Sequence, residues 1–195
     1  MYSNMEKINL AIFVSGGGTN CENIIRHFQD NPRVSIPIVV SSSSDAYAIT
    51  RARNLGVPTT VITRKQLNEQ PDMVFAATEG CDYIILAGFL PKVPEYLIER
   101  FPNRIINIHP ALQPKFGGKG MWGHHVHEAV KAAGETESGI TIHYVNAELD
   151  QGEHIAQYST PLSPSDTAED IADKVHELEM RYFPGVIEQV IMGNE

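Results

Sequence analysis

Short apolar segments that alternate with amphipathic segments limit the folds that this chain can adopt. Because strands joined by helices pair in parallel through right-handed crossovers, this order predicts a Rossmann-like, doubly wound α/β sheet with helices on both faces. A late strand pair around an acidic turn should extend this mainly parallel sheet. We therefore expect a single domain over residues 1–195. The predicted strands are Ile8–Val14, Val34–Val40, Val57–Ile62, Tyr83–Ala87, Ile105–Ile108, Gly139–Val145 and His154–Thr160.

Several residues predict where helices begin and end. Asp45 is expected to be the N-cap of one helix, and Gly56 to be the C′ residue that follows it. Pro71 interrupts a stretch with helical spacing, and Pro184 is expected to bend or break the long C-terminal helix.

The composition is that of a soluble globular protein, with 42% hydrophobic and 20% charged residues. A net charge of −9 argues against nucleic acid or an anionic membrane as a partner, because both bind basic surfaces. The two cysteines, Cys21 and Cys81, have no metal-binding spacing. No apolar run approaches 18 residues, and residues 1–7 lack the apolar core of a signal peptide. We expect a cytoplasmic protein.

A glycine-rich stretch, Gly16–Asn20, follows the first predicted strand and opens a helix. Unpaired amides at a helix N-terminus bind phosphate, and glycine allows a ligand to approach the backbone. The stretch is not a Walker motif, and Cys21 stands where a dinucleotide fingerprint has its third glycine. No acidic residue follows the second strand to bind a ribose. The pattern favours a phosphate monoester over a dinucleotide, and an ordinary tight turn is the alternative.

Asn107 and His109 alternate with apolar residues at the end of the fifth predicted strand, and Pro110 stops that strand. Residues two apart on a strand project to the same side, and ligands of open α/β sheets bind beyond the carboxyl ends of the strands. An amide can hydrogen-bond a developing oxyanion, and an imidazole can transfer a proton near neutral pH. These two residues are the first candidates for catalysis, against the alternative that His109 is structural.

Asp150 lies in the acidic turn Glu148–Glu153. Such a turn is ordinarily a solvated hairpin. If it folds over the end of the fifth strand, the Asp150 carboxylate would favour the protonated form of the His109 imidazole.

Three histidines, His124, His125 and His127, begin a predicted helix after the glycine-rich loop 113–123. A histidine-rich helix start can bind zinc. No cysteine or carboxylate stands at a recognised metal spacing, and adjacent histidines point in different directions on a helix. We expect no metal.

Four segments at matching spacing carry a resemblance to a known family. The chain closely resembles the phosphoribosylglycinamide formyltransferases, folate-dependent enzymes of purine synthesis in the formyltransferase superfamily, from Ile8 to about Ile191. The segments are Phe13-Val-Ser-Gly-Gly-Gly-Thr-Asn20, Leu86-Ala-Gly-Phe-Leu90, Ile106-Asn-Ile-His-Pro-Ala-Leu-Gln-Pro-Lys115 and Ile140-Thr-Ile-His-Tyr-Val-Asn-Ala-Glu-Leu-Asp150.

This resemblance implies that 10-formyltetrahydrofolate donates a formyl group to the amine of glycinamide ribonucleotide. The family's catalytic residues fall on Asn107, His109 and Asp150. Its phosphate and ribose contacts fall on Gly18, Thr19, Asn20 and Glu179. Its folate pocket falls on Arg64, Leu90, Pro91, Lys92, Val93 and Asn107.

Other functions remain open at this stage. Formyltetrahydrofolate hydrolases share the Asn-His-Asp chemistry but usually carry an N-terminal regulatory domain, and only seven residues precede the first strand here. Methionyl-tRNA formyltransferases usually continue into a tRNA-binding domain, which the acidity of this chain suits poorly. A sugar-nucleotide formyltransferase and, from a different class, a non-catalytic nucleotide-binding module are the remaining alternatives.

Overall fold

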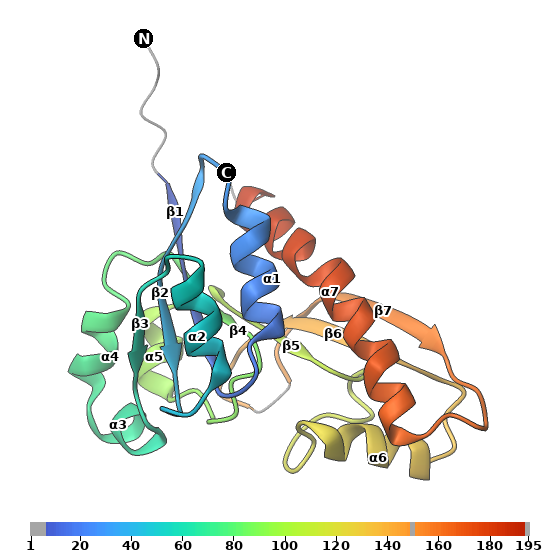
Figure 1. Ribbon diagram of the computed structural model, residues 1–195. Coiled ribbons are helices and arrows are strands. Elements are labelled where there is room, and N and C mark those ends of the chain that lie inside the picture. The colour runs from blue at the N-terminus through green and yellow to red at the C-terminus, as the bar shows by residue number, and fades with distance from the viewer. Residues whose placement is uncertain (1–6, 149–150, 194–195) are drawn as a thin grey trace. The chain divides into compact units, whose positions relative to one another are not determined.

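The computed structural model describes residues 7–148 and 151–193, and the chain forms two compact units, Met1–Ile105 and Ile106–Glu195. Figure 1 labels the helices and strands of both.

The first unit is a parallel sheet with the strand order β3-β2-β1-β4. Its central strand β1 is apolar, and the five residues from Leu10 to Val14 are fully buried. A strand flanked on both sides must bury both faces, which explains a continuous apolar run rather than an alternating one. The four strands are β1 Ile8–Val14, β2 Val34–Ser41, β3 Thr59–Val61 and β4 Tyr83–Leu86.

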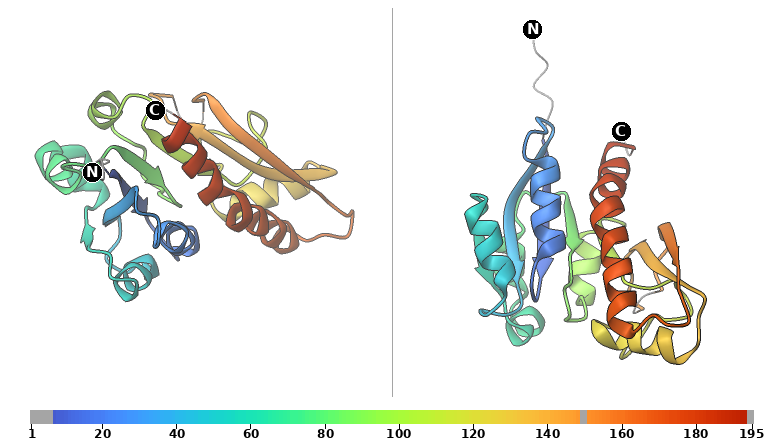
Figure 2. Two further views of the ribbon diagram at one scale, coloured as in Figure 1. Left: turned by 90° about the horizontal axis from the view of Figure 1, so that it is seen from above. Right: turned by 45° about the vertical axis from the view of Figure 1, so that its right-hand side comes forward.

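Helices cover both faces of this sheet, as predicted. Figure 2 shows α1 and α2 on one face and α4 and α5 on the other. The helices are α1 Thr19–Phe28, α2 Tyr47–Asn54, α3 Arg64–Glu69, α4 Pro71–Ala77 and α5 Glu95–Arg100.

Two of the predicted helix boundaries are confirmed and one is wrong. Pro71 is the first residue of α4, a position where the missing N–H costs no hydrogen bond. Gly56 follows the C-cap of α2 with φ 75°. The N-cap of α2, however, is Ala46 and not Asp45, and no side chain caps this helix. The amide of Ala48 instead donates to the Gly16 carbonyl at 3.0 Å, so the glycine-rich turn satisfies one donor at the helix start.

The second unit pairs β5, Ile105–His109, with β6, Glu137–Tyr144, and β6 with β7, His154–Pro161, all antiparallel. The predicted late strand pair is thus confirmed as β6 and β7. Helix α7, Ala168–Gly193, packs along these two strands and against α6, His124–Ala132 (Figure 1). Pro184 lies inside α7, which continues past it to Gly193, so of the bend or break expected at this residue the break does not occur.

Among the described residues, no helix combines the length and apolar character needed to cross a membrane.

Candidate active site

The antiparallel register of β5 and β6 sets the neighbours of the two candidate catalytic residues. Asn107 is paired with His143, and His109 with Thr141. Directly opposed residues project from the same face of a sheet, so all four side chains share one face. The strand end that the sequence predicts is therefore the centre of a polar cluster in the second unit.

His143 orients the Asn107 amide. Asn107 Nδ2 lies 3.1 Å from His143 Nε2, and His143 Nδ1 lies 2.9 Å from the Tyr144 carbonyl oxygen. A carbonyl only accepts hydrogen bonds, so Nδ1 carries the imidazole proton and Nε2 accepts from the Asn107 amide. His143 thus uses one of the two Asn107 Nδ2 hydrogens. The second has no partner among the described residues and can serve an oxyanion.

His109 is buried, with 4% of its surface exposed, and contacts the following loop. Its Nε2 lies 2.5 Å from the Phe116 carbonyl oxygen, to which it donates. This contact fixes the plane of the imidazole ring beside Asn107. The imidazole and the Asn107 amide therefore lie on the same face of one strand. Because Nε2 already donates to Phe116, the imidazole can add a second donor beside the Asn107 amide only through a protonated Nδ1, and two such donors stabilise negative charge on a carbonyl oxygen.

Thr141 holds the turn that follows His109. Its buried hydroxyl donates to the Ala111 carbonyl at 2.7 Å and accepts from the Gln113 amide at 3.0 Å and from Gln157 Nε2 at 2.8 Å. Gln157 Nε2 also donates to the Gln113 carbonyl at 3.0 Å. One hydroxyl on β6 and one amide on β7 thus fix the backbone just beyond the Asn107–His109 strand end.

Replacing Thr141 by valine, which has the same shape but no hydroxyl, is expected to lower the free energy of unfolding by about 2 kcal/mol, because two buried backbone groups lose their partner. Chemical denaturation measures the change. The matched control is Thr160→Val, since Thr160 on β7 makes no side-chain hydrogen bond among the described residues and should tolerate the exchange. Equal stability of the two variants would contradict this role of Thr141.

Glu179, the predicted ribose contact, lies on α7 and is paired with His176. Glu179 Oε2 is 3.1 Å from His176 Nδ1, and this hydrogen bond raises the pKa of His176. The nearby His127 is buried, which lowers its pKa because the charged imidazole loses hydration, although the Glu179 carboxylate opposes this shift. The α6–α7 packing thus brings Glu179 beside two histidines.

The pairing of His176 predicts a pH-dependent contribution to stability. A pKa that is raised in the folded state stabilises below the unfolded value of about 6.5, and this stabilisation is lost as the pH rises through the folded pKa. The stability difference between the native protein and His176→Gln should therefore be largest in mild acid and should disappear at alkaline pH. Denaturation curves across that range test this. A difference that grows with pH would contradict it.

The predicted phosphate-binding residues Gly18, Thr19 and Asn20 lie at the start of α1 in the first unit. Gly18 has φ 77°, and a Cβ there would lie 2.4 Å from the Ala48 Cβ. Both observations require glycine, because a side chain would strain the backbone and collide with α2. The helix α2 therefore packs directly against the glycine loop.

The predicted folate-binding segment begins beside this loop. The Leu90 amide donates to Ser15 Oγ at 2.9 Å, and Ser15 Oγ is 2.6 Å from Ser42 Oγ. Leu90 is 60% exposed, whereas Val93 is buried. The first unit thus places an exposed apolar side chain close to the glycine loop.

The remaining predicted residues fall elsewhere or cannot be placed. Arg64 is the exposed first residue of α3, next to the N-cap Thr63. Pro91 and Lys92 follow Leu90 in the loop before α5. Asp150 lies outside the described residues. Within residues 7–148 and 151–193, no group of three or more His, Cys, Asp or Glu side chains could hold a metal ion.

Three residues of this cluster were not predicted: Thr141, His143 and Gln157. A signal for the first two is present in the sequence, because Thr141 and His143 alternate with the isoleucines of β6, as Asn107 and His109 alternate with those of β5. Only the strand register shows that the two polar pairs face each other.

Comparisons with known proteins agree with this architecture. The family model for formyl transferase matches residues 8–187. A chloroplastic phosphoribosylglycinamide formyltransferase of Arabidopsis thaliana is 36% identical over 95% of this chain and 68% of its own length. The enzyme of that name from Haemophilus influenzae is 34% identical over 97% of this chain and 89% of its own.

A solved structure extends the agreement to the fold. The crystal structure of phosphoribosylglycinamide formyltransferase from Anaplasma phagocytophilum matches with a TM-score of 0.86 and 32% identity, covering 96% of this chain and 89% of the other.

The parallel sheet flanked by helices, together with these matches, places the chain among the α/β enzymes of group transfer. The chain belongs to the formyl transferase family.

Proposed function

We propose that the protein transfers the formyl group of 10-formyltetrahydrofolate to the primary amine of glycinamide ribonucleotide in purine synthesis. The observation that carries this proposal is the pair of donors on β5. Asn107 is oriented by His143 with one amide hydrogen remaining, and His109 projects from the same face. The names of the similar proteins support the same reaction.

In the proposed reaction, the substrate amine attacks the formyl carbon, and negative charge develops on the formyl oxygen. Asn107 Nδ2 and the Nδ1–H of a protonated His109 imidazole stabilise that charge. As the bond to the folate nitrogen breaks, a proton must move from the attacking amine to the leaving nitrogen, a role that we assign to Asp150 acting with His109.

Binding of the two substrates is assigned to other groups. We assign the phosphate of glycinamide ribonucleotide to the amides of Gly18, Thr19 and Asn20, and its ribose to Glu179. The folate is assigned to the Leu90–Val93 segment together with Arg64. Support for the phosphate assignment comes from the positive φ of Gly18 and the position of the loop at the start of α1.

A spectroscopic formyl-transfer assay tests the proposal. The native protein with 10-formyltetrahydrofolate should produce tetrahydrofolate only when glycinamide ribonucleotide is present, and a reaction with water in place of the amine is the control. Deformylation that does not require the amine would favour the hydrolase alternative. Stabilisation of the protein by NAD and not by glycinamide ribonucleotide would favour a nucleotide-binding module.

A further inference from the structure

All three glycine carbonyls of the loop are held by donors from α1 and α2. The Gly16 carbonyl accepts from the Ala48 amide at 3.0 Å, and the Gly18 carbonyl from the Glu22 amide at 2.9 Å. The Gly17 carbonyl between them accepts from Arg51 Nε, also at 2.9 Å. Two of these three donors are backbone amides, and the third is the side chain of Arg51.

These contacts determine where the loop amides point. In a trans peptide the N–H of the next residue is directed opposite to the carbonyl. Fixing three successive carbonyls thus directs the amides of Gly17, Gly18 and Thr19 away from the donors. Within the described residues, these three amides donate no hydrogen bond. Amides that have no partner at the start of a helix are the donors that an anion requires.

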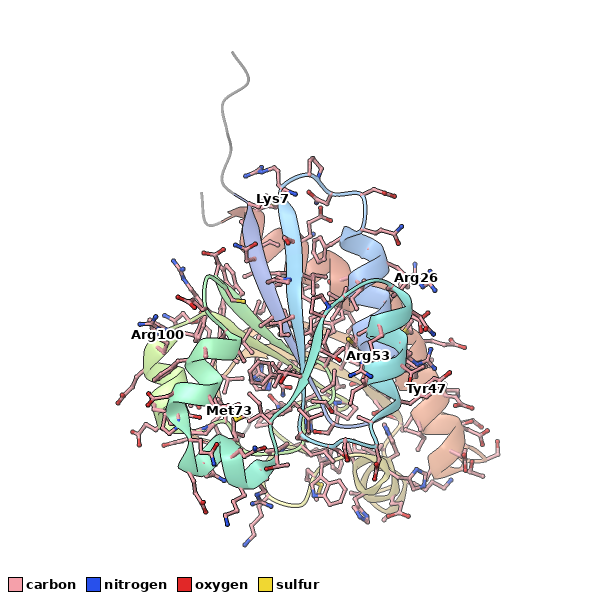
Figure 3. All side chains as sticks on the ribbon, turned by 60° about the vertical axis from the view of Figure 1, so that its left-hand side comes forward. Lys7, Arg26, Tyr47, Arg53, Met73 and Arg100 are labelled. Atoms are coloured by element: carbon pink, nitrogen blue, oxygen red, sulfur yellow. The ribbon has the colours of Figure 1, made fainter. Side chains whose placement is uncertain are left out.

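Arg51 has three partners: the Gly17 carbonyl, the Glu22 carboxylate and the Tyr47 ring. Its Nη1 pairs with the Glu22 carboxylate, and the Glu22 Oε1 atom also accepts from Arg26 Nη2 at 2.8 Å. The Arg51 guanidinium lies 5.0 Å from the centre of the Tyr47 ring. In Figure 3, Tyr47 lies on α2 and Arg26 on the neighbouring α1. A planar guanidinium can donate to a carbonyl and a carboxylate at once, whereas a lysine ammonium does not have this fork.

We propose that Arg51 is a positioning residue for phosphate binding: by holding the Gly17 carbonyl, it keeps the loop amides directed at the substrate phosphate. This inference rests on the proposed function of the loop. Arg51 acts through the backbone, and no contact between Arg51 and the phosphate is required.

Loss of the Arg51 charge is a competing explanation for weaker phosphate binding in an Arg51 variant. Experiment can separate this explanation from the positioning role. Hydrogen bonds from Arg26 and Arg51 lower the pKa of Glu22, so this carboxylate is ionised at neutral pH. Loss of Arg51 would leave a less compensated negative charge near the start of α1, which would also weaken anion binding. If charge alone matters, adding Glu22→Gln to an Arg51 variant should restore binding. If Arg51 positions the loop, it should not.

The experiment compares Arg51→Met and Arg51→Lys with Arg53→Met. Arg53, labelled in Figure 3, is the matched control, because it lies on the same helix and its Nε donates to Thr59 Oγ1 at 2.9 Å and not to a loop carbonyl. Both Arg51 variants should raise the KM for glycinamide ribonucleotide by about tenfold or more, with kcat and the folate KM within about twofold of native values. Arg53→Met should behave as the native protein.

Two further measurements make the outcome specific. The dephosphorylated substrate, glycinamide riboside, should react equally well with the native protein and both Arg51 variants. Ribose 5-phosphate binding, measured by calorimetry, should weaken by a similar factor in both variants and should not recover in Arg51→Met with Glu22→Gln. Melting temperatures identify any variant that fails to fold. If Arg51→Met does not fold, the same measurements on Arg51→Lys, which keeps the charge, test the proposal.

The outcomes separate this inference from the proposed function. Native ribose 5-phosphate affinity in the folded Arg51 variants, or recovery in the double variant, would overturn the positioning role even if formyl transfer is confirmed. If the native protein does not formylate glycinamide ribonucleotide, the calorimetric comparison still decides whether Arg51 controls phosphate binding.

Discussion

Replacing His109 or Asn107 by alanine is expected to lower kcat about a hundredfold or more, since loss of one oxyanion donor typically costs about 2.7–4 kcal/mol of transition-state stabilisation. Asn107→Asp should be as damaging as alanine, because a carboxylate has the same shape but cannot donate and repels the developing charge. Substrate affinities should change much less than kcat. Steady-state kinetics of each purified variant measures both.

The interpretation requires that these variants fold. His109 is buried and contacts the Phe116 carbonyl, so its removal also costs some stability, which thermal melting would register. His154→Ala is the matched control, because His154 is an exposed histidine of the same sheet, at the start of β7. Near-native turnover in a folded Asn107 or His109 variant would overturn the assignment of these residues to catalysis.

The sequence predicts the candidate site at the end of β5 because its signal is local. Asn107 and His109 alternate with apolar residues immediately before Pro110, and a proline there must end the strand. The role of His143 is not local. It depends on a pairing between residues 36 positions apart, and a shift of the antiparallel register would place another β6 residue opposite Asn107. The candidate donors were therefore predictable, and the residues that orient them were not.

Tertiary contacts also explain the wrongly predicted N-cap of α2 and the continuation of α7 through Pro184. Asp45 has the side chain of an N-cap, yet the amide of Ala48 already has a partner in the Gly16 carbonyl, so a tertiary contact replaces the local one. Pro184 lies in a helix that packs along β6 and β7, and this packing maintains the helix through a residue that would interrupt an isolated one. In both cases tertiary contacts override a local preference.

Gly152 leaves no room for a side chain. A Cβ at this position would lie 1.5 Å from the Tyr144 carbonyl oxygen and 3.4 Å from His143 Nδ1. The same carbonyl accepts the hydrogen bond that fixes the His143 proton on Nδ1. Gly152→Ala must therefore move the Tyr144 carbonyl, release His143 and leave the Asn107 amide without its orientation. We expect a loss of about 3 kcal/mol in stability, at the upper end for overpacking, and a fall in kcat approaching that of Asn107→Ala.

Gly185→Ala is the matched control for this change. Gly185 lies within α7, and a Cβ there would meet no atom within 4 Å, so alanine should stabilise the helix by about 0.5–1 kcal/mol without affecting turnover. Imidazole ¹⁵N chemical shifts report directly on the His143 tautomer: the Nδ1–H form should dominate in the native protein and in Gly185→Ala, and should lose this dominance in Gly152→Ala. Because the orienting contact runs from Tyr144 through His143 to Asn107, the tautomer change and the loss of kcat must occur together. A Gly152→Ala protein that lost the tautomer preference but kept native turnover would show that the orientation of Asn107 by His143 is dispensable for catalysis.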